Sequence, residues 1–260
     1  MAEKDLILPG RRRILLSQRP HLMAILNMAP DSFYDGGVVN GVPDAIQRVE
    51  QMLEDGADII DVGGESTRPG ALPVPLDEEI QRVVPVVEAL RSHWRVPISI
   101  DTYKAEVAKR ALDAGADIIN DVSGLRFDPA MIKVAKETTA PLVVMHMLGS
   151  PRDMQKNPQY SDVVAEVRAF FEERYRALVD AGINPSRIIF DPGIGFGKKL
   201  EHNLALLADL DELVVENRPL LVGASRKSFI GALLDVPDPA LRLNGSIAVT
   251  ALAVFLGASI

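Results

Sequence analysis

The sequence predicts an α/β protein, a (β/α)8 TIM barrel, from three observations. Short runs rich in β-branched residues alternate along the chain with amphipathic segments. Most of these runs are continuously apolar, as in parallel strands that are covered on their outer face. The segment GADII at residues 56–60 recurs at residues 115–119, where each glycine would end a helix just before a strand. Seven such units would also fit an open doubly wound sheet, and the repeat favours the barrel.

Seven strands are expected, at residues 22–26, 57–62, 97–101, 116–120, 141–146, 187–191 and 219–223. The segments between them carry apolar residues at helical spacing, and Asp128 followed by Pro129 predicts a helix start. A third, partial copy of the repeat occupies residues 257–260, so we expect the eighth strand to be truncated in this sequence. Because 260 residues suit one barrel of roughly 250, a single domain over residues 1–260 is expected.

Composition narrows the class of protein. The net charge of −8 argues against a nucleic-acid partner, and an anionic substrate would need a local positive pocket. The absence of cysteine excludes disulfides and thiolate-bound metals. The longest apolar stretch, residues 247–260, has about 14 residues and is too short to span a bilayer. With no signal-peptide pattern at the N-terminus, we expect a cytoplasmic protein without a membrane partner.

Polar side chains end the expected strands, where the active sites of barrel enzymes lie. They are Asn27, Asp61, Asp101, Asn120, Asp121, His146 and Asp191. Two long loops rich in glycine and proline follow the first two strands, at residues 27–41 and 62–76, and are typical of binding loops. Residues 191–198 are glycine-rich, and residues 223–228 form a cationic helix start suited to an anion. This ring of polar residues predicts a functional site, although any single member could serve only as a loop or helix cap.

Seven sequence blocks resemble the dihydropteroate synthase family, in order and at family spacing, over residues 22–260. The blocks are ILNMAPDSFYDGG (25–37), GADIIDVGGESTRPG (56–70), ISIDTYKAEVA (98–108), GADIINDVSG (115–124), PLVVMHMLGSPRDMQ (141–155), DPGIGFGK (191–198) and LVGASRKSFIG (221–231). The second and last of these blocks are specific even alone.

The resemblance implies a pterin-binding barrel that condenses p-aminobenzoate with 6-hydroxymethyl-7,8-dihydropterin pyrophosphate to give 7,8-dihydropteroate and pyrophosphate in folate biosynthesis. It assigns catalysis to Asp101, Asp191 and Lys227. The implied pterin ligands are Thr67, Asp101, Asn120, Met145, Asp191, Phe196, Gly223 and Lys227. The implied p-aminobenzoate ligands are Phe33, Thr67, Arg68, Pro69, Phe196, Lys227 and Ser228.

The resemblance also implies Mg²⁺ at Asn27, a homodimer and an enzyme class that is a sulfonamide target, without deciding the sensitivity of this chain. The family places an arginine and a histidine on its eighth strand, and this sequence contains neither at its end. A second departure is Ala29, where the family usually has threonine. Two alternatives stay open: a pterin-binding methyltransferase of the corrinoid type, and a non-catalytic pterin-binding homologue. His146 is expected to be an oriented structural donor rather than an acid–base group.

Overall fold

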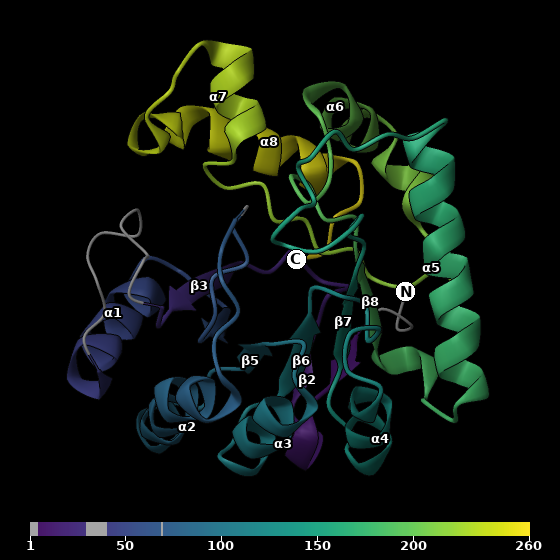
Figure 1. Ribbon diagram of the computed structural model, residues 1–260. Helices are drawn as coiled ribbons and strands as arrows, with labels where there is room; N and C mark the ends of the chain where they lie inside the picture. Colours follow the sequence, from purple (N-terminus) through teal and green to yellow (C-terminus); the bar gives the residue numbers. More distant parts are fainter. Residues whose placement is uncertain (1–4, 30–40, 69) are drawn as a thin grey trace.

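Six parallel strands form the central sheet and follow one another in chain order (Figure 1). In this computed structural model the described residues are 5–29, 41–68 and 70–260. The strands are β3 Met23–Asn27, β4 Ile59–Gly63, β5 Ile98–Asp101, β6 Ile118–Asp121, β7 Leu142–Met145 and β8 Ile188–Asp191. Six of the seven predicted strands are thereby confirmed to within two residues at either end.

The helices lie around the outside of the strands and connect them in sequence (Figure 1). They are α1 Val42–Glu54, α2 Leu76–His93, α3 Ala105–Asp113, α4 Ala130–Glu137, α5 Val163–Asp180, α6 Leu200–Ala208, α7 Ser228–Leu234 and α8 Leu243–Phe255, with short 3-10 turns η2 Pro9–Arg11, η3 Pro185–Arg187, η4 Leu210–Leu213 and η5 Pro239–Arg242. The repeat glycines Gly56 and Gly115 have φ values of 99° and 113°. This left-handed conformation ends a helix, as the repeat predicted. The Asp128 carboxylate accepts the Ala130 N–H at 2.9 Å, which agrees with the expected start of α4.

The prediction of a seventh strand at residues 219–223 is wrong, because only Leu220 pairs with the sheet, opposite Phe190. Phe190 donates its N–H to Pro219 at 3.0 Å and accepts from Leu221 at 2.8 Å. The next bond of a parallel ladder would need the N–H of residue 192, and that residue is proline, which has none. The pairing therefore stops after one bridge.

Ser259 and Ile260 lie between the segment 220–222 and His21, where an eighth strand is expected. Ser259 donates to Leu220 at 2.8 Å and accepts from the N–H of His21 at 2.9 Å, which joins the two sides of the sheet. The Ile260 carbonyl accepts from Val222 at 3.0 Å. The last two residues thus lie beside residues 220–222, where the repeat predicted the eighth strand, and the α/β barrel class is confirmed.

A short N-terminal hairpin, β1 Leu6–Ile7 paired with β2 Arg13–Ile14, closes the end of the barrel at which the strands begin. The sequence did not predict this hairpin. Its apolar side chains pack with residues from the barrel interior. That cluster comprises Leu6, Leu8, Ile14, Leu16, Ile59, Ile118, Val143, Ile189 and Leu221. Two-residue strands are too short for a periodic signal. The hairpin leaves the opposite end, where the strands have their carboxyl ends, as the functional face.

The main apolar core lies between the strands and the helices, in two clusters built on the outward-facing strand residues. Phe171 of α5 and Phe190 of β8 are fully buried and stack with their ring centroids 4.5 Å apart. Over residues 5–29, 41–68 and 70–260, no helix combines the length and apolarity needed to cross a membrane.

Candidate active site

The polar residues predicted at the strand ends do lie together at the carboxyl end of the barrel. The register pairs Asn27 with Gly63, Gly63 with Asp101, and Asp101 with Asn120. On the other side of the mouth, Met145 at the end of β7 pairs with Asp191 at the end of β8. In-register parallel strands bring these residues to one level because each strand ends at the same edge.

Near this level, the buried carboxylates offer more hydrogen-bond acceptors than the residues around them have donors. Asn120 donates its side-chain amide to Asp61 Oδ2 at 3.1 Å. In the described part of the chain, Asp61 Oδ1, Asp101 Oδ1 and Ser99 Oγ are buried without a hydrogen-bond partner. Burial raises the pKa of Asp61, and burial together with the charges of Asp61 and Glu79 raises the pKa of Asp101 well above its usual range. The site therefore presents buried acceptors that a ligand with N–H groups would satisfy.

Asp191 sits at the start of the glycine-rich loop with one oxygen already engaged. Its Oδ1 accepts the N–H of Gly193 at 2.7 Å. Burial raises the pKa of Asp191, while the charges of Lys227 and Lys198 oppose the rise. Gly193 has φ of 64°, and a Cβ there would lie 2.0 Å from the His146 carbonyl oxygen. Only glycine fits at this position, so the loop follows the backbone after β7 closely.

Lys227 reaches the same loop from the segment before α7. Its Nζ donates to the carbonyl of Ile194 and lies 4.5 Å from the centroid of the Phe196 ring. Burial lowers the pKa of Lys227 to about 8, and the Asp191 charge counteracts this shift. Helix α7 begins at Ser228, directly after this lysine. Gly223 leaves space nearby, since a Cβ added there would be 4.0 Å from Lys227 Nζ.

The loop after β4 carries Thr67, which is half-buried, and Arg68, which is exposed. A partly buried ionic cluster holds the base of this loop: Lys104 donates to Glu65 at 2.6 Å and also pairs with Glu79. Glu65 in turn accepts the N–H of Val74 at 2.9 Å, which ties the two ends of the loop together. The predicted p-aminobenzoate residues Phe33 and Pro69 lie outside the described residues.

The sequence assigned no role to Asp61, Lys198 or the Glu65–Lys104 pair, although Asp61 stood among the polar strand residues. A signal existed for Asp61, a carboxylate inside an otherwise apolar strand. Lys198 is buried and lies against His146, with its Nζ 3.0 Å from Nδ1. Burial and the Lys198 charge lower the pKa of His146 to about 2. The ring is therefore neutral, and its Nδ1 accepts from Lys198, whereas a donor was expected.

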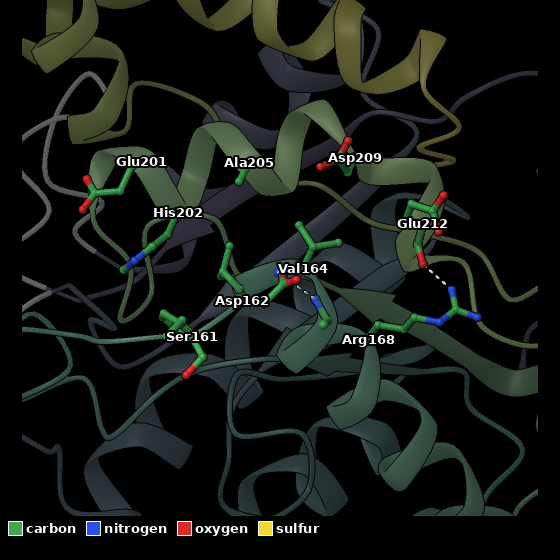
Figure 2. A pocket seen from close by; sticks show the side chains of 12 residues that line it. Ser161, Asp162, Val164, Arg168, Glu201, His202, Ala205, Asp209 and Glu212 are labelled. Carbon is green, nitrogen blue, oxygen red and sulfur yellow. Dashed lines mark hydrogen bonds between the residues drawn. The ribbon is translucent and has the colours of Figure 1, made fainter.

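A groove outside the barrel, between the start of α5 and helix α6, encloses a cavity of about 710 Å³ (Figure 2). Its charged and polar lining includes Asp162, Arg168, Glu201, His202, Asp209 and Glu212. Four carboxylates beside one arginine would repel a diphosphate. None of these residues belongs to the predicted site, so the strand ends are the better candidate for the chemistry despite the size of this groove.

A barrel whose mouth combines buried acceptors, a lysine and a glycine-rich loop defines an enzyme class that binds a flat, nitrogen-rich heterocycle. Residues 23–260 match the family described as "Pterin binding enzyme". The dihydropteroate synthase of Escherichia coli strain K12 is 51% identical over 241 residues, covering 93% of this chain and 85% of that protein. The one from Synechocystis is 49% identical over 243 residues, covering 94% and 84%.

Solved structures agree with these sequence matches. A Yersinia pestis dihydropteroate synthase with a sulfonamide drug has a TM-score of 0.92 at 46% identity, covering 98% of this chain and 90% of that one. The Burkholderia cenocepacia enzyme complexed with 7,8-dihydropteroate has a TM-score of 0.88 at 46% identity, covering 99% and 89%. A Xanthomonas albilineans dihydropteroate synthase with 4-aminobenzoic acid scores 0.90 at 44% identity, covering 98% and 90%. This chain belongs to the pterin-binding enzyme family, and the expectation of a dihydropteroate synthase is confirmed over the corrinoid and non-catalytic alternatives.

Proposed function

We propose that the described mouth of the barrel binds the dihydropterin pyrophosphate and p-aminobenzoate, and that Asp101, Asp191 and Lys227 act on them. The observation that carries this proposal is the pair of buried acceptors on Asp61 and Asp101 that have no hydrogen-bond partner among the described residues. Buried acceptors without partners are costly in a folded protein, at about 1–3 kcal/mol each. A ligand that brings several N–H donors would remove that penalty.

A pterin has the matching edge. Its 2-amino-pyrimidinone side presents parallel N–H donors, to which a carboxylate offers two acceptors in suitable geometry. Asp191 is the candidate for this contact, with Asp101 and Asn120 taking further ring nitrogens. Lys227 would donate to the ring carbonyl. Met145, Phe196 and Gly223 would shape the slot around the flat faces, and Thr67 would complete it.

The second substrate would occupy the outer part of the site. Thr67 and Arg68 lie in the loop after β4, and Ser228 is the first residue of α7. Arg68 is exposed and cationic, as expected for a residue that meets an aryl carboxylate. The 4-aminobenzoic acid bound by the Xanthomonas albilineans relative supports this assignment by similarity.

Asn27 is the proposed Mg²⁺ ligand. Its Oδ1 accepts the N–H of Ala29 at 2.9 Å and keeps a second lone pair. Within the described ranges no group of three or more acidic or histidine side chains could hold a metal. One neutral amide oxygen, completed by waters and phosphate oxygens, fits a hard octahedral ion that arrives with its diphosphate. When bound, Mg²⁺ would supply positive charge to the leaving group.

The reaction breaks the bond between the pterin methylene carbon and the diphosphate oxygen, whose electron pair leaves with the diphosphate. The amine nitrogen of p-aminobenzoate forms the new C–N bond and then loses one proton. Asp101 and Asp191 would stabilise positive charge that develops on the pterin. Since an arylamine is neutral and already nucleophilic, no strong base is needed before attack.

The test is a coupled measurement of dihydropteroate and pyrophosphate formation from the two substrates, with and without Mg²⁺. We expect equal amounts of both products, and we expect Asp101→Asn and Asp191→Asn to reduce turnover strongly. Pyrophosphate release without dihydropteroate would contradict the proposed reaction. Near-normal turnover in both variants would contradict the residue assignment.

We further propose that the chain forms a homodimer through α8 and the turn before it. Apolar side chains are exposed there, with Leu241 72%, Ile247 58% and Phe255 86% accessible. Such a patch is unusual on a monomer and suits a self-complementary interface. Phe255→Lys should shift the sedimentation coefficient from dimer to monomer at micromolar concentration. An unchanged coefficient in the variant, or a wild-type monomer, would refute this interface.

A further inference from the structure

Lys198 ends the glycine-rich loop after β8 and is buried, with only 3% of its surface exposed. Its Nζ donates to His146 Nδ1 at 3.0 Å and to the carbonyl of Phe196 at 3.0 Å. A longer contact of 3.4 Å reaches the His146 carbonyl. The three ammonium donors are thus directed to neutral acceptors on two separate segments of the chain.

In the proposed function these two segments would border the pterin on either side, as two walls. His146 follows Met145 at the end of β7, and Phe196 lies in the loop after β8. Met145 belongs to a small cluster with Val122, Met147 and Met154, against which Phe196 packs. Lys198 therefore donates both to His146, the neighbour of Met145, and to the backbone carbonyl of Phe196.

The loop is also held close to the first wall by its glycines. A Cβ added to Gly197 would lie 2.6 Å from the Leu148 carbonyl oxygen, and one added to Gly193 would lie 2.0 Å from the His146 carbonyl oxygen. Gly195 is fixed from behind by two side chains, because its N–H donates to Asn203 at 2.7 Å and its carbonyl accepts from Gln155 at 2.6 Å. The loop therefore has one well-defined path.

The charge of Lys198 also influences the nearby Asp191 carboxylate. Burial lowers the pKa of Lys198 to about 7, and the negative charge of Asp191 opposes this shift. His146 is neutral, so its Nδ1 has a lone pair for the lysine. An ammonium buried here favours the ionised carboxylate on which the proposed pterin contact depends.

We propose that Lys198 is a positioning residue that fixes the separation of the Met145 and Phe196 walls and thereby selects a flat two-ring heterocycle. This inference rests on the proposed function of the mouth. Lys198 itself needs no contact with substrate, since it acts through His146 and the backbone of Phe196. The lysine would thus affect which ring system binds and would take no part in the reaction itself.

The experiment compares two ligands on Lys198→Met. One is 6-hydroxymethylpterin; the other is 2-amino-4-hydroxypyrimidine, which has the same hydrogen-bonding edge and one ring only. We expect the variant to lose about tenfold in affinity for the pterin, about 1.4 kcal/mol, and less than about threefold for the pyrimidine. Lys133→Met, at a lysine whose side chain is 79% exposed, is the matched control and should change neither.

A purely structural role would lower both affinities by one factor together with the melting temperature, and that result would overturn the inference. So would unchanged pterin affinity in Lys198→Met. A second pair of variants tests the same link if the lysine variant does not fold. His146→Asn keeps an acceptor near the place of Nδ1, and His146→Leu removes it, so only the leucine variant should lose pterin preference.

Equal ligand preference in the two His146 variants would also overturn the inference. The wild-type protein separates this failure from a failure of the proposed function. If the wild type binds neither ligand, the proposed function fails. If the wild type binds the pterin and makes dihydropteroate while both variant series behave like it, only the role of Lys198 fails.

Discussion

Replacing Asp191 by asparagine is the sharpest test of the pterin contact, because the structure fixes how the new side chain must sit. Asp191 Oδ1 accepts the Gly193 N–H at 2.7 Å. In Asp191→Asn the amide oxygen has to keep that bond, since the alternative would place two donors face to face. The amide NH₂ then occupies the position of the second carboxylate oxygen and faces the N–H edge of the ligand.

The loss follows from that geometry. A hydrogen bond to a charged acceptor contributes about 1.5–3 kcal/mol, and an unsatisfied buried donor costs about 1–3 kcal/mol. The sum is about 3–4 kcal/mol at the lower part of these ranges, which corresponds to roughly 150- to 900-fold weaker binding. Calorimetry with 6-hydroxymethylpterin measures this directly, and melting temperature serves as the folding control. A dissociation constant within about threefold of wild type, in a folded variant, would refute the assigned contact.

Three further outcomes are expected. Because burial lowers the pKa of Lys227 to about 8, the ammonium is lost as pH rises through that value, and pterin affinity by calorimetry should fall about 30-fold between about pH 7 and 9.5; Lys227→Met should remove this pH dependence. Burial raises the pKa of Asp121 to about 6, so between about pH 4 and 6 the folded state holds a proton that the unfolded state has lost, and stability decreases as pH rises. Asp121→Asn should therefore increase the free energy of unfolding in urea by roughly 2–3 kcal/mol at about pH 8 and change it little near pH 3.5, whereas equal effects at both would contradict this reasoning. Phe171→Ala, which removes a fully buried ring stacked on Phe190, should lower that free energy by about 3–5 kcal/mol, and a loss under about 1 kcal/mol would show that the site collapses.

The sequence predicted the parts of the fold that have a strong periodic or repeated signal. Continuous apolar runs located β3 to β8, and the glycines of the repeat located the helix ends. The seventh strand failed for a reason that local propensity does not contain: the residue that would continue its pairing is Pro192, directly after β8, and proline has no N–H to donate. The β1–β2 hairpin was missed because its stability comes from packing under the barrel and not from its own residues.

The site could be predicted as a set of residue types, because each polar residue follows an apolar strand. Partnerships between strands could not be predicted in the same way. Asn120 donates to Asp61, which lies 59 positions earlier in the chain, and Lys198 contacts His146, which lies 52 positions away. Register and loop path set such contacts, and a single sequence does not encode either in a local pattern. The assignments to Phe33 and Pro69 stay predictions.

The orphaned acceptors also explain how this mouth can discriminate among heterocycles. Asp61 Oδ1 and Asp101 Oδ1 are buried without partners among the described residues, so they favour a ligand that brings donors. A flat ring with acceptors on the same edge would leave both carboxylates unsatisfied and add repulsion, and sites of this kind reject ligands that lack the matching groups far more strongly than apolar pockets reject a missing methylene. Since the raised pKa of Asp101 arises partly from neighbouring charges, N–H donors at this edge would relieve carboxylate repulsion as well as pair the oxygen. The N–H donors of a pterin would thus pair the buried oxygens of Asp61 and Asp101, which a ring without such donors would not.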